Sequence, residues 1–110
     1  MRHRLFHYDG DLAIVDYSRT KLNLIDTSGI VTELESPETI ANNYNVVAVV
    51  GSDIYVLCGT GEDHIYKYDG STWSYHCDLG EPCCSLLNFE DQFLIASTLG
   101  VDAKILKIPL

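Results

Sequence analysis

Short runs of apolar residues alternate with turn-forming residues along the whole chain. Val, Ile, Leu and Tyr fill the runs, and Gly, Asp, Ser and Asn separate them. This alternation is typical of β-strands joined by tight turns. One segment, residues 36–43, begins with Ser36 before Pro37 and predicts at most one or two helical turns within a loop. The pattern therefore predicts an all-β fold.

The predicted strands repeat with a period of about 40 residues. One set of strands starts with a polar residue and continues with apolar ones: residues 11–15, 53–57 and 92–96. This alignment places Phe93 at the position of Leu12 and Ile54. A second set recurs at nearly the same spacing: residues 22–26, 65–69 and 105–109. In the first two copies a further turn leads to a fourth strand: residues 30–34 and 73–77.

Tight turns precede the first set of strands. Asp9-Gly10 suits a type I′ hairpin and Gly51-Ser52 a type II′ hairpin, because Gly tolerates the positive φ that these turns need. Glu90-Asp91 occupies the equivalent place in the third copy. Each copy is therefore predicted to be an antiparallel meander that opens with a hairpin.

Four antiparallel strands in about 40 residues are the size of one blade of a β-propeller. We expect a single propeller-like domain over residues 1–110, with blade 1 at about 2–35, blade 2 at about 45–79 and blade 3 at about 83–110. The third blade has three predicted strands, and its fourth strand is missing. The predicted fold class is thus all-β, with antiparallel four-stranded blades in a β-propeller-like arrangement.

Blade 2 resembles a kelch-type repeat. An apolar strand at residues 53–57 is followed by Cys58 and Gly59, and the segment from Ile65 to Gly70 precedes Trp73. The match covers residues 53–77, although Cys58 stands where kelch blades have the first Gly of a pair. The resemblance implies a role in binding other proteins, since kelch-like propellers mostly do so, and some members are enzymes or bind sugars.

Three blades predict open surfaces. Closed propellers have about 4–8 blades, so three blades leave two sheet faces uncovered. We expect these faces to self-associate, with two chains closing a six-bladed ring, or to dock another protein, which could also add a strand to the third blade. A piece of a longer propeller and an open β-sandwich are the plainer alternatives. The candidate interface residues are Leu5, Phe6, Phe89, Phe93, Ile105 and Ile108.

Charge narrows the choice of partner. Sixteen acidic and seven basic residues give a net charge of −9, and Lys67 is the only basic residue between Leu22 and Ala103. Nucleic acid is therefore not expected as a partner, because binding phosphates needs clustered Lys and Arg. A basic protein surface fits better. No apolar run reaches the length of a membrane span or a signal-peptide core, so we expect a cytoplasmic protein or part of an assembly formed in the cytoplasm, a virus particle included.

Candidate chemistry is sparse. No nucleophile motif accompanies the histidines, so no catalytic residue, cofactor or metal site is predicted. Glu62, Asp63 and His64 could form an acid–base or metal cluster, but a solvated turn is the simpler interpretation. The four cysteines lack the C-x-x-C spacing of a zinc site and are expected to be reduced. The leading hypothesis is a non-enzymatic binding or assembly module.

Two alternative functions remain open. A carbohydrate or small-ligand site could use the aromatic residues of blade 2, for which the candidates are Tyr66, Tyr68, Trp73 and Tyr75. A divergent propeller enzyme is the second alternative, and it requires acidic and His side chains to converge on one cleft.

Overall fold

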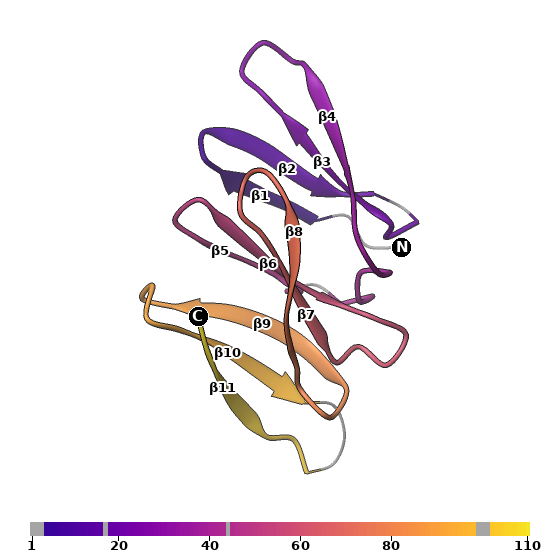
Figure 1. The fold of residues 1–110 in the computed structure, drawn as a ribbon, viewed down its shortest axis with the longest axis vertical. Coiled ribbons are helices and arrows are strands. Elements are labelled where there is room, and N and C mark those ends of the chain that lie inside the picture. The colour runs from indigo at the N-terminus through magenta and orange to yellow at the C-terminus, as the bar shows by residue number, and fades with distance from the viewer. Residues whose placement is uncertain (1–3, 17, 44, 99–101) are drawn as a thin grey trace.

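In a computed structural model, the chain folds into three antiparallel β-sheets (Figure 1). The structure describes residues 4–16, 18–43, 45–98 and 102–110, and the side chains of residues 4 and 5 lie outside the described part. Blade 1 consists of β1 (Arg4–Tyr8), β2 (Asp11–Val15), β3 (Lys21–Ile25) and β4 (Val31–Glu35). Blade 2 consists of β5 (Val47–Val50), β6 (Asp53–Cys58), β7 (His64–Tyr68) and β8 (Trp73–Asp78). Blade 3 consists of β9 (Cys83–Phe89), β10 (Phe93–Thr98) and β11 (Ile105–Pro109).

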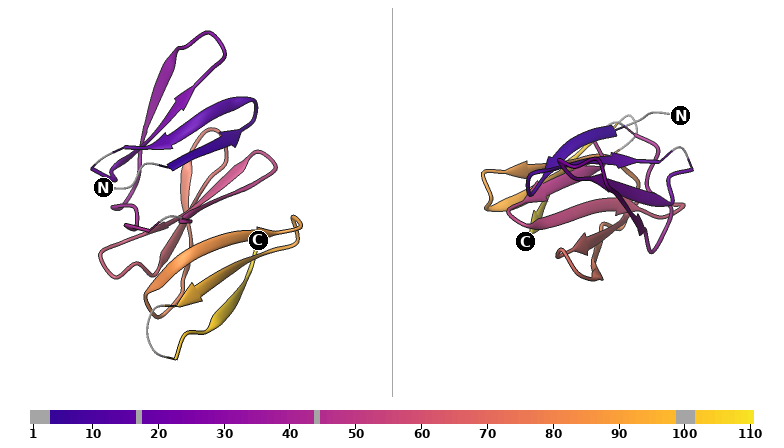
Figure 2. Two further views of the ribbon diagram at one scale, coloured as in Figure 1. Left: turned by 180° about the vertical axis from the view of Figure 1, so that it is seen from behind. Right: turned by 90° about the horizontal axis from the view of Figure 1, so that it is seen from above.

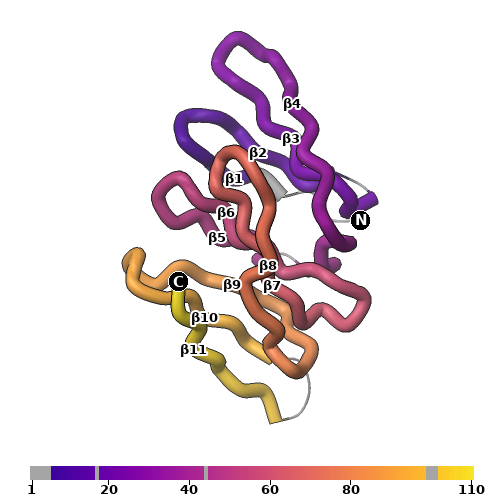
Figure 3. The backbone as a smooth tube through the Cα atoms, in the orientation of Figure 1, coloured from indigo at the N-terminus to yellow at the C-terminus, as the bar shows by residue number. Residues whose placement is uncertain are grey.

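In each blade, the strands pair with their sequence neighbours. The blades stack along the long axis of the molecule, with blade 2 between the other two (Figures 1 and 3). The views from behind and from above show the same order, and the molecule measures 46 × 30 × 20 Å (Figure 2). The predicted fold class is therefore confirmed: two four-stranded blades are followed by a three-stranded one.

The hairpins of the first two blades have the predicted turn chemistry. Asp9 and Gly10 have φ values of 47° and 82°, as a type I′ turn requires. Gly51 has a φ of 60°, as a type II′ turn requires at its first central position. In both hairpins the turn contains two residues, and the residues that flank it pair directly: Tyr8 with Asp11, and Val50 with Asp53. The two blades therefore have the same pairing register at this hairpin.

The hairpin of blade 3 differs, and it corrects the sequence alignment. Phe89 pairs with Phe93, so the turn contains the three residues 90–92. The extra residue moves Leu94, rather than Phe93, into the position of Ile54 in blade 2. Because neighbouring residues of a strand point to opposite faces, the two side chains exchange sides: Leu94 is fully buried, and Phe93 is only partly buried.

Residues 36–43 contain no helix. The backbone N–H of Ile40 donates to the carbonyl of Arg19, and Ile40 forms an isolated bridge with Cys58. The N–H of Gly59 donates to the carbonyl of Thr39. These contacts hold the segment as an extended link between blade 1 and blade 2, and its backbone groups are therefore not free to form a helical turn.

Each blade has two faces, which we name by their neighbours. The front face points toward the preceding blade, and the back face points toward the following one. In blade 2 the front face carries Ile54, Val56 and Tyr68, and the back face carries Tyr55, Leu57 and Ile65. All six side chains are at most 8% exposed.

Contacts between blades identify which face meets which neighbour. The hydroxyl of Tyr8 in blade 1 donates to the carbonyl of Ser52 in the first turn of blade 2, at 2.6 Å. On the other side, His76 contacts the ring of Tyr55 edge-on, and its Nε2 donates to the carbonyl of Pro109 in blade 3 at 2.7 Å. The core is therefore the pair of interfaces on either side of blade 2.

All four cysteines are free thiols, with Cys58 and Cys83 buried. Within the described ranges, no helix has the length and apolar character needed to cross a membrane.

Candidate functional site

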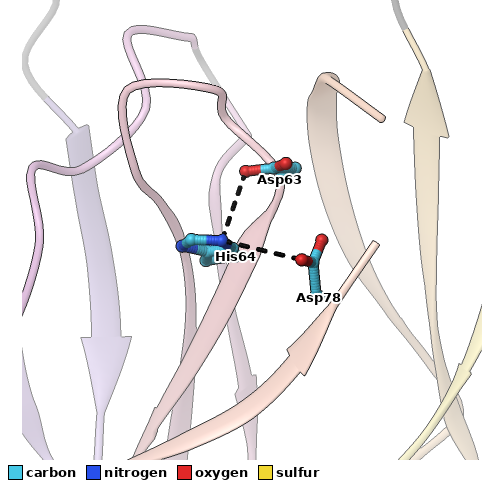
Figure 4. A group of neighbouring side chains, drawn as sticks. All are labelled: Asp63, His64 and Asp78. Carbon is cyan, nitrogen blue, oxygen red and sulfur yellow. Dashed lines mark ion pairs between the residues drawn. The ribbon is translucent and has the colours of Figure 1, made fainter. Parts of the chain in front are cut away.

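A histidine and two aspartates meet at one end of blade 2 (Figure 4). His64 is the first residue of β7, Asp63 precedes it in the loop from β6, and Asp78 ends β8 directly opposite His64. The Nε2 atom of His64 lies 3.6 Å from Oδ1 of Asp63 and 3.8 Å from Oδ2 of Asp78. Both carboxylates therefore face the same nitrogen.

The position of Asp63 is fixed by its backbone. Its carbonyl accepts a hydrogen bond from the N–H of Leu79, at 2.7 Å, and the neighbouring carbonyl of Glu62 accepts from Cys83, at 2.9 Å. The β6–β7 loop is thus tied to the connection between blades 2 and 3. Asp63 and Asp78 are held near one another by these bonds and by the β7–β8 pairing.

Glu38 holds the other side of the imidazole. Nδ1 of His64 lies 3.0 Å from both carboxylate oxygens of Glu38, and the hydroxyl of Tyr66 donates to Oε2 of the same carboxylate. Glu38 comes from the link after blade 1, so the contact joins two blades. Since a carboxylate only accepts, Nδ1 of His64 carries the proton and donates.

Gly59 makes room for this pair. It has a φ of +97°, and a Cβ at this position would lie 3.1 Å from Oε1 of Glu38 and 3.3 Å from Nδ1 of His64. The positive φ disfavours any side chain, and the close approach disfavours it again. The glycine is therefore a spatial requirement of the Glu38–His64 contact.

The pKa shifts follow from these contacts. The hydrogen bond to Glu38 raises the pKa of His64, and burial opposes this effect. The hydrogen bond from Tyr66 lowers the pKa of Glu38, and the same bond raises the pKa of Tyr66 to about 12. At neutral pH, Glu38 is therefore an anion and Tyr66 a neutral donor.

The structure brings together part of the cluster anticipated from the sequence. Asp63 and His64 do share a site, whereas the carboxylate of Glu62 accepts from Asn43 instead. Glu38 and Asp78 were not anticipated. Asp78 could have been found by extending the predicted β7–β8 pairing by one residue. Glu38 could not, because its segment has no local signal for the contact.

The four aromatic candidates share the front face of blade 2 but differ in their surroundings. Tyr68 is 8% exposed and packs on Trp73, with ring centroids 5.2 Å apart, so these two belong to the core and its edge. Tyr66 donates to Glu38, as described above. Tyr75 is 53% exposed and contacts the ring of Tyr66 edge-on, at 5.4 Å. Tyr66 and Tyr75 therefore belong to the His64 site, and Tyr68 is not available to a ligand.

The candidate interface residues divide between inner and outer faces. Phe89, Phe93 and Ile105 lie on the back face of blade 3, which no other part of the described chain covers. The sequence had placed Phe6 and Ile108 with them, but both face blade 2, and Ile108 is only 4% exposed. The side chain of Leu5 lies outside the described part.

The front face of blade 1 is the second open face. Its strands carry Leu12, Ile14, Ile25 and Val31, which match Ile54, Val56, Tyr68 and Trp73 of blade 2 in register. Val31 is 54% exposed, and the neighbouring Ile30 is 64% exposed. The stack therefore ends in a front face on one side and a back face on the other.

Comparison with known proteins identifies the fold. No protein-family model matches the chain, and no curated protein matches it by sequence. A solved structure titled streptogramin B lyase matches with a TM-score of 0.66 and 18% identity, over 96% of this chain and 39% of that chain. The chain thus spans about two fifths of the matched protein. At this identity the likeness concerns the fold alone: the three sheets are arranged as blades of a β-propeller.

Proposed function

We propose that the chain is a non-enzymatic assembly module whose two open blade faces bind a second copy of the same chain. The observation that carries the proposal is the exposure of apolar side chains in positions that are buried between blades elsewhere. On the back face of blade 3, Leu87, Phe89 and Ile105 are 57%, 44% and 76% exposed. Apolar surface of this kind marks an interaction site.

The two open faces are of opposite type, and this supports association between copies. In the described part of the chain, the back face of blade 1 packs on the front face of blade 2, and the back face of blade 2 packs on the front face of blade 3. The open back face of blade 3 and the open front face of blade 1 can make that same contact with each other across two chains. Two head-to-tail contacts would close a ring of six blades with two-fold symmetry, within the size range of closed propellers.

Polar groups on the two faces also match. Lys107 lies on the open back face above the ring of Phe93, and Glu35 lies on the open front face, where Lys21 pairs with Glu33 at 2.8 Å. The Oδ1 atom of Asn23, on the same front face, is buried without a hydrogen-bond partner among the described residues. Asn23 holds the position of Tyr66, which in blade 2 bonds to the link from the preceding blade.

The kelch-type resemblance of blade 2 supports a binding role of this kind. Strand addition at β11, the outer edge of blade 3, would let the partner chain extend the three-stranded sheet. The likeness to a lyase contributes the fold to this proposal and not an activity.

Light scattering coupled to size exclusion tests the proposal. The chain has a mass of 12.3 kDa, and we expect a particle of twice that mass at micromolar concentration. Val31→Lys disables the front face and Leu87→Lys the back face, so each variant alone should be monomeric. Ser71→Lys, in the exposed β7–β8 turn, is the matched charge control and should remain dimeric.

Mixing the two variants makes the test specific. The front face of the Leu87→Lys chain and the back face of the Val31→Lys chain are both intact, so the mixture should recover a dimer with one native contact. If the wild type is still monomeric at about 200 μM, its dimer dissociation constant is too weak for a specific contact, and the proposal is overturned. A dimer that survives both variants would overturn it too. Monomeric wild-type protein that binds another chain through these faces would assign them to a different partner.

A further inference from the structure

From the geometry of the His64 cluster we infer a binding site for a first-row divalent metal ion of the zinc type. Nε2 of His64, Oδ1 of Asp63 and Oδ2 of Asp78 are its ligands, and Glu38 positions the histidine. This inference is independent of the proposed assembly, because the site lies at one end of blade 2 and not on either open face.

The three ligand atoms have the spacing that such an ion needs. One ligand atom from each residue lies within 4.8 Å of the other two. Bonds of 2.0–2.2 Å at a tetrahedral ion separate two ligand atoms by about 3.3–3.6 Å. The observed distances from Nε2, 3.6 Å to Asp63 and 3.8 Å to Asp78, are close to this value and too long for hydrogen bonds. A small rotation of Asp78, whose side chain is 53% exposed, would complete the geometry.

The histidine presents one ring nitrogen to the two aspartates. Glu38 accepts the proton of Nδ1, so Nε2 is the nitrogen that faces Asp63 and Asp78, and its lone pair can bind a metal when the ring is neutral. A carboxylate behind a metal-binding histidine is the usual arrangement of an outer shell, because it fixes the ring and increases its basicity. Glu38 is fixed in turn by Tyr66, and Gly59 leaves the space for it.

The charge and exposure of the site also suit a cation. In the described part of the chain, neither Asp63 nor Asp78 forms an ion pair with a lysine or arginine, and His64 is their only basic neighbour. The side chains of His64 and Asp63 are 31% and 26% exposed, so water can occupy a fourth position. One imidazole and two carboxylates favour zinc over calcium or magnesium, which prefer oxygen ligands alone.

Titration of untagged full-length protein with Zn²⁺ and Co²⁺ tests the inference. We expect one ion per chain, and Co²⁺ should give the visible absorption of a tetrahedral centre. His64→Ala should abolish binding, and Asp78→Asn should weaken it by at least tenfold. Glu38→Gln, which acts through the histidine, should weaken it about 10–100-fold, as outer-shell changes do.

Two control variants separate the site from general attraction to an acidic protein. His76→Ala removes a histidine from the opposite face of β8, and Glu35→Gln removes a carboxylate from the exposed strand β4. Both should bind Zn²⁺ within about twofold of the wild type, since the same set of ligands remains.

Nitrogen NMR of the wild type gives a readout that needs no variant. Addition of Zn²⁺ should shift the Nε2 resonance of His64 and leave its Nδ1 protonated. If the protein takes up no Zn²⁺ at a concentration of about 1 mM, any dissociation constant is too weak for a specific site, and the inference is overturned. Binding that persists in His64→Ala, or a shift at His7 or His76 in place of His64, would overturn it as well, and the cluster would then serve only to join the blades.

Discussion

Leu94 and Phe93 are neighbours in β10, and the structure predicts very different costs for truncating them. Leu94 is 0% exposed and faces blade 2, so Leu94→Ala leaves a cavity between two blades. Such changes cost about 2–5 kcal/mol, and we expect about 3 kcal/mol here. Phe93 lies on the open back face. Phe93→Ala removes a stacked contact with Phe89, whose ring centroid lies 5.1 Å away, and the cation–π contact with Lys107, whose Nζ lies 4.5 Å from the centroid of the Phe93 ring. Together these contribute about 1–2 kcal/mol when exposed.

Urea denaturation followed by circular dichroism measures both costs. The experiment is done with each variant in the Val31→Lys background, which is expected to be monomeric, so that self-association does not contribute to either cost. With a slope of about 1–1.5 kcal/mol per molar urea for a chain of this size, Leu94→Ala should lower the midpoint by about 2 M. Phe93→Ala should lower it by about one third to two thirds of that amount. Ile95→Ala, on the same open face as Phe93, is the control for truncation of an outward side chain.

The comparison is decisive because a two-residue turn at Glu90-Asp91 would reverse the two faces of β10. With Phe93 at the position of Ile54, Phe93 would be the core residue and Leu94 the outward one. If Phe93→Ala proves as destabilising as Leu94→Ala, the three-residue turn of blade 3 and its assignment of faces are refuted.

Three other predictions follow from single residues. Gly59→Ala should destabilise the fold by about 1–3 kcal/mol in urea, because a side chain at φ +97° is strained and would crowd Glu38. Burial opposes ionisation of Asp16, but the hydrogen bonds that its carboxylate accepts from Ser18 and from backbone amides lower its pKa. The stability that this carboxylate contributes is therefore present above its unfolded pKa of about 3.9 and is lost as the pH falls through its lower folded pKa. The free energy of unfolding of the wild type should thus fall more between about pH 5 and about pH 2 than that of Asp16→Asn, as urea denaturation at each pH would show. Burial raises the pKa of the Cys58 thiol to about 12. Iodoacetamide at about pH 8, close to the pKa of a free thiol, should therefore modify Cys58 only after the protein unfolds. Peptide mass mapping would show this.

Local chemistry explains which parts of the fold could be predicted. The first two hairpins follow from Asp9-Gly10 and Gly51-Ser52, whose conformations are set by the glycines themselves. The turn of blade 3 has no glycine, and yet Glu90 and Asp91 both adopt positive φ, at 50° and 60°. Nothing in these two residues distinguishes a two-residue turn from a three-residue one. The error of one residue in register, and with it the exchange of faces, therefore had no local signal.

The His64 site shows the same limit for contacts that are distant in sequence. His64 and Asp63 are adjacent and could be noticed together, but Glu38 lies 26 residues before the histidine it contacts. Its segment also has a helix-like start at Ser36 and Pro37, which predicts a different conformation. The backbone contacts of Ile40 override that local preference. Only the packing of the link against blade 2 brings Glu38 to the site.

The distribution of buried side chains connects the fold with the proposed assembly. Blade 2 has neighbours on both sides, and from Ile54 to Cys58 each residue of β6 is at most 2% exposed. The terminal blades bury one face each, so in β2 Ala13 and Val15 are buried whereas Leu12 and Ile14 are not. In a stack of repeats, stability is a sum over the units and the interfaces between them, and an end unit therefore lacks one interface. A contact between the two ends would give blades 1 and 3 the second interface that blade 2 already has. The stack has a front face at one end and a back face at the other. A contact between two chains would therefore pack a back face on a front face, as the contacts between blades inside the chain do.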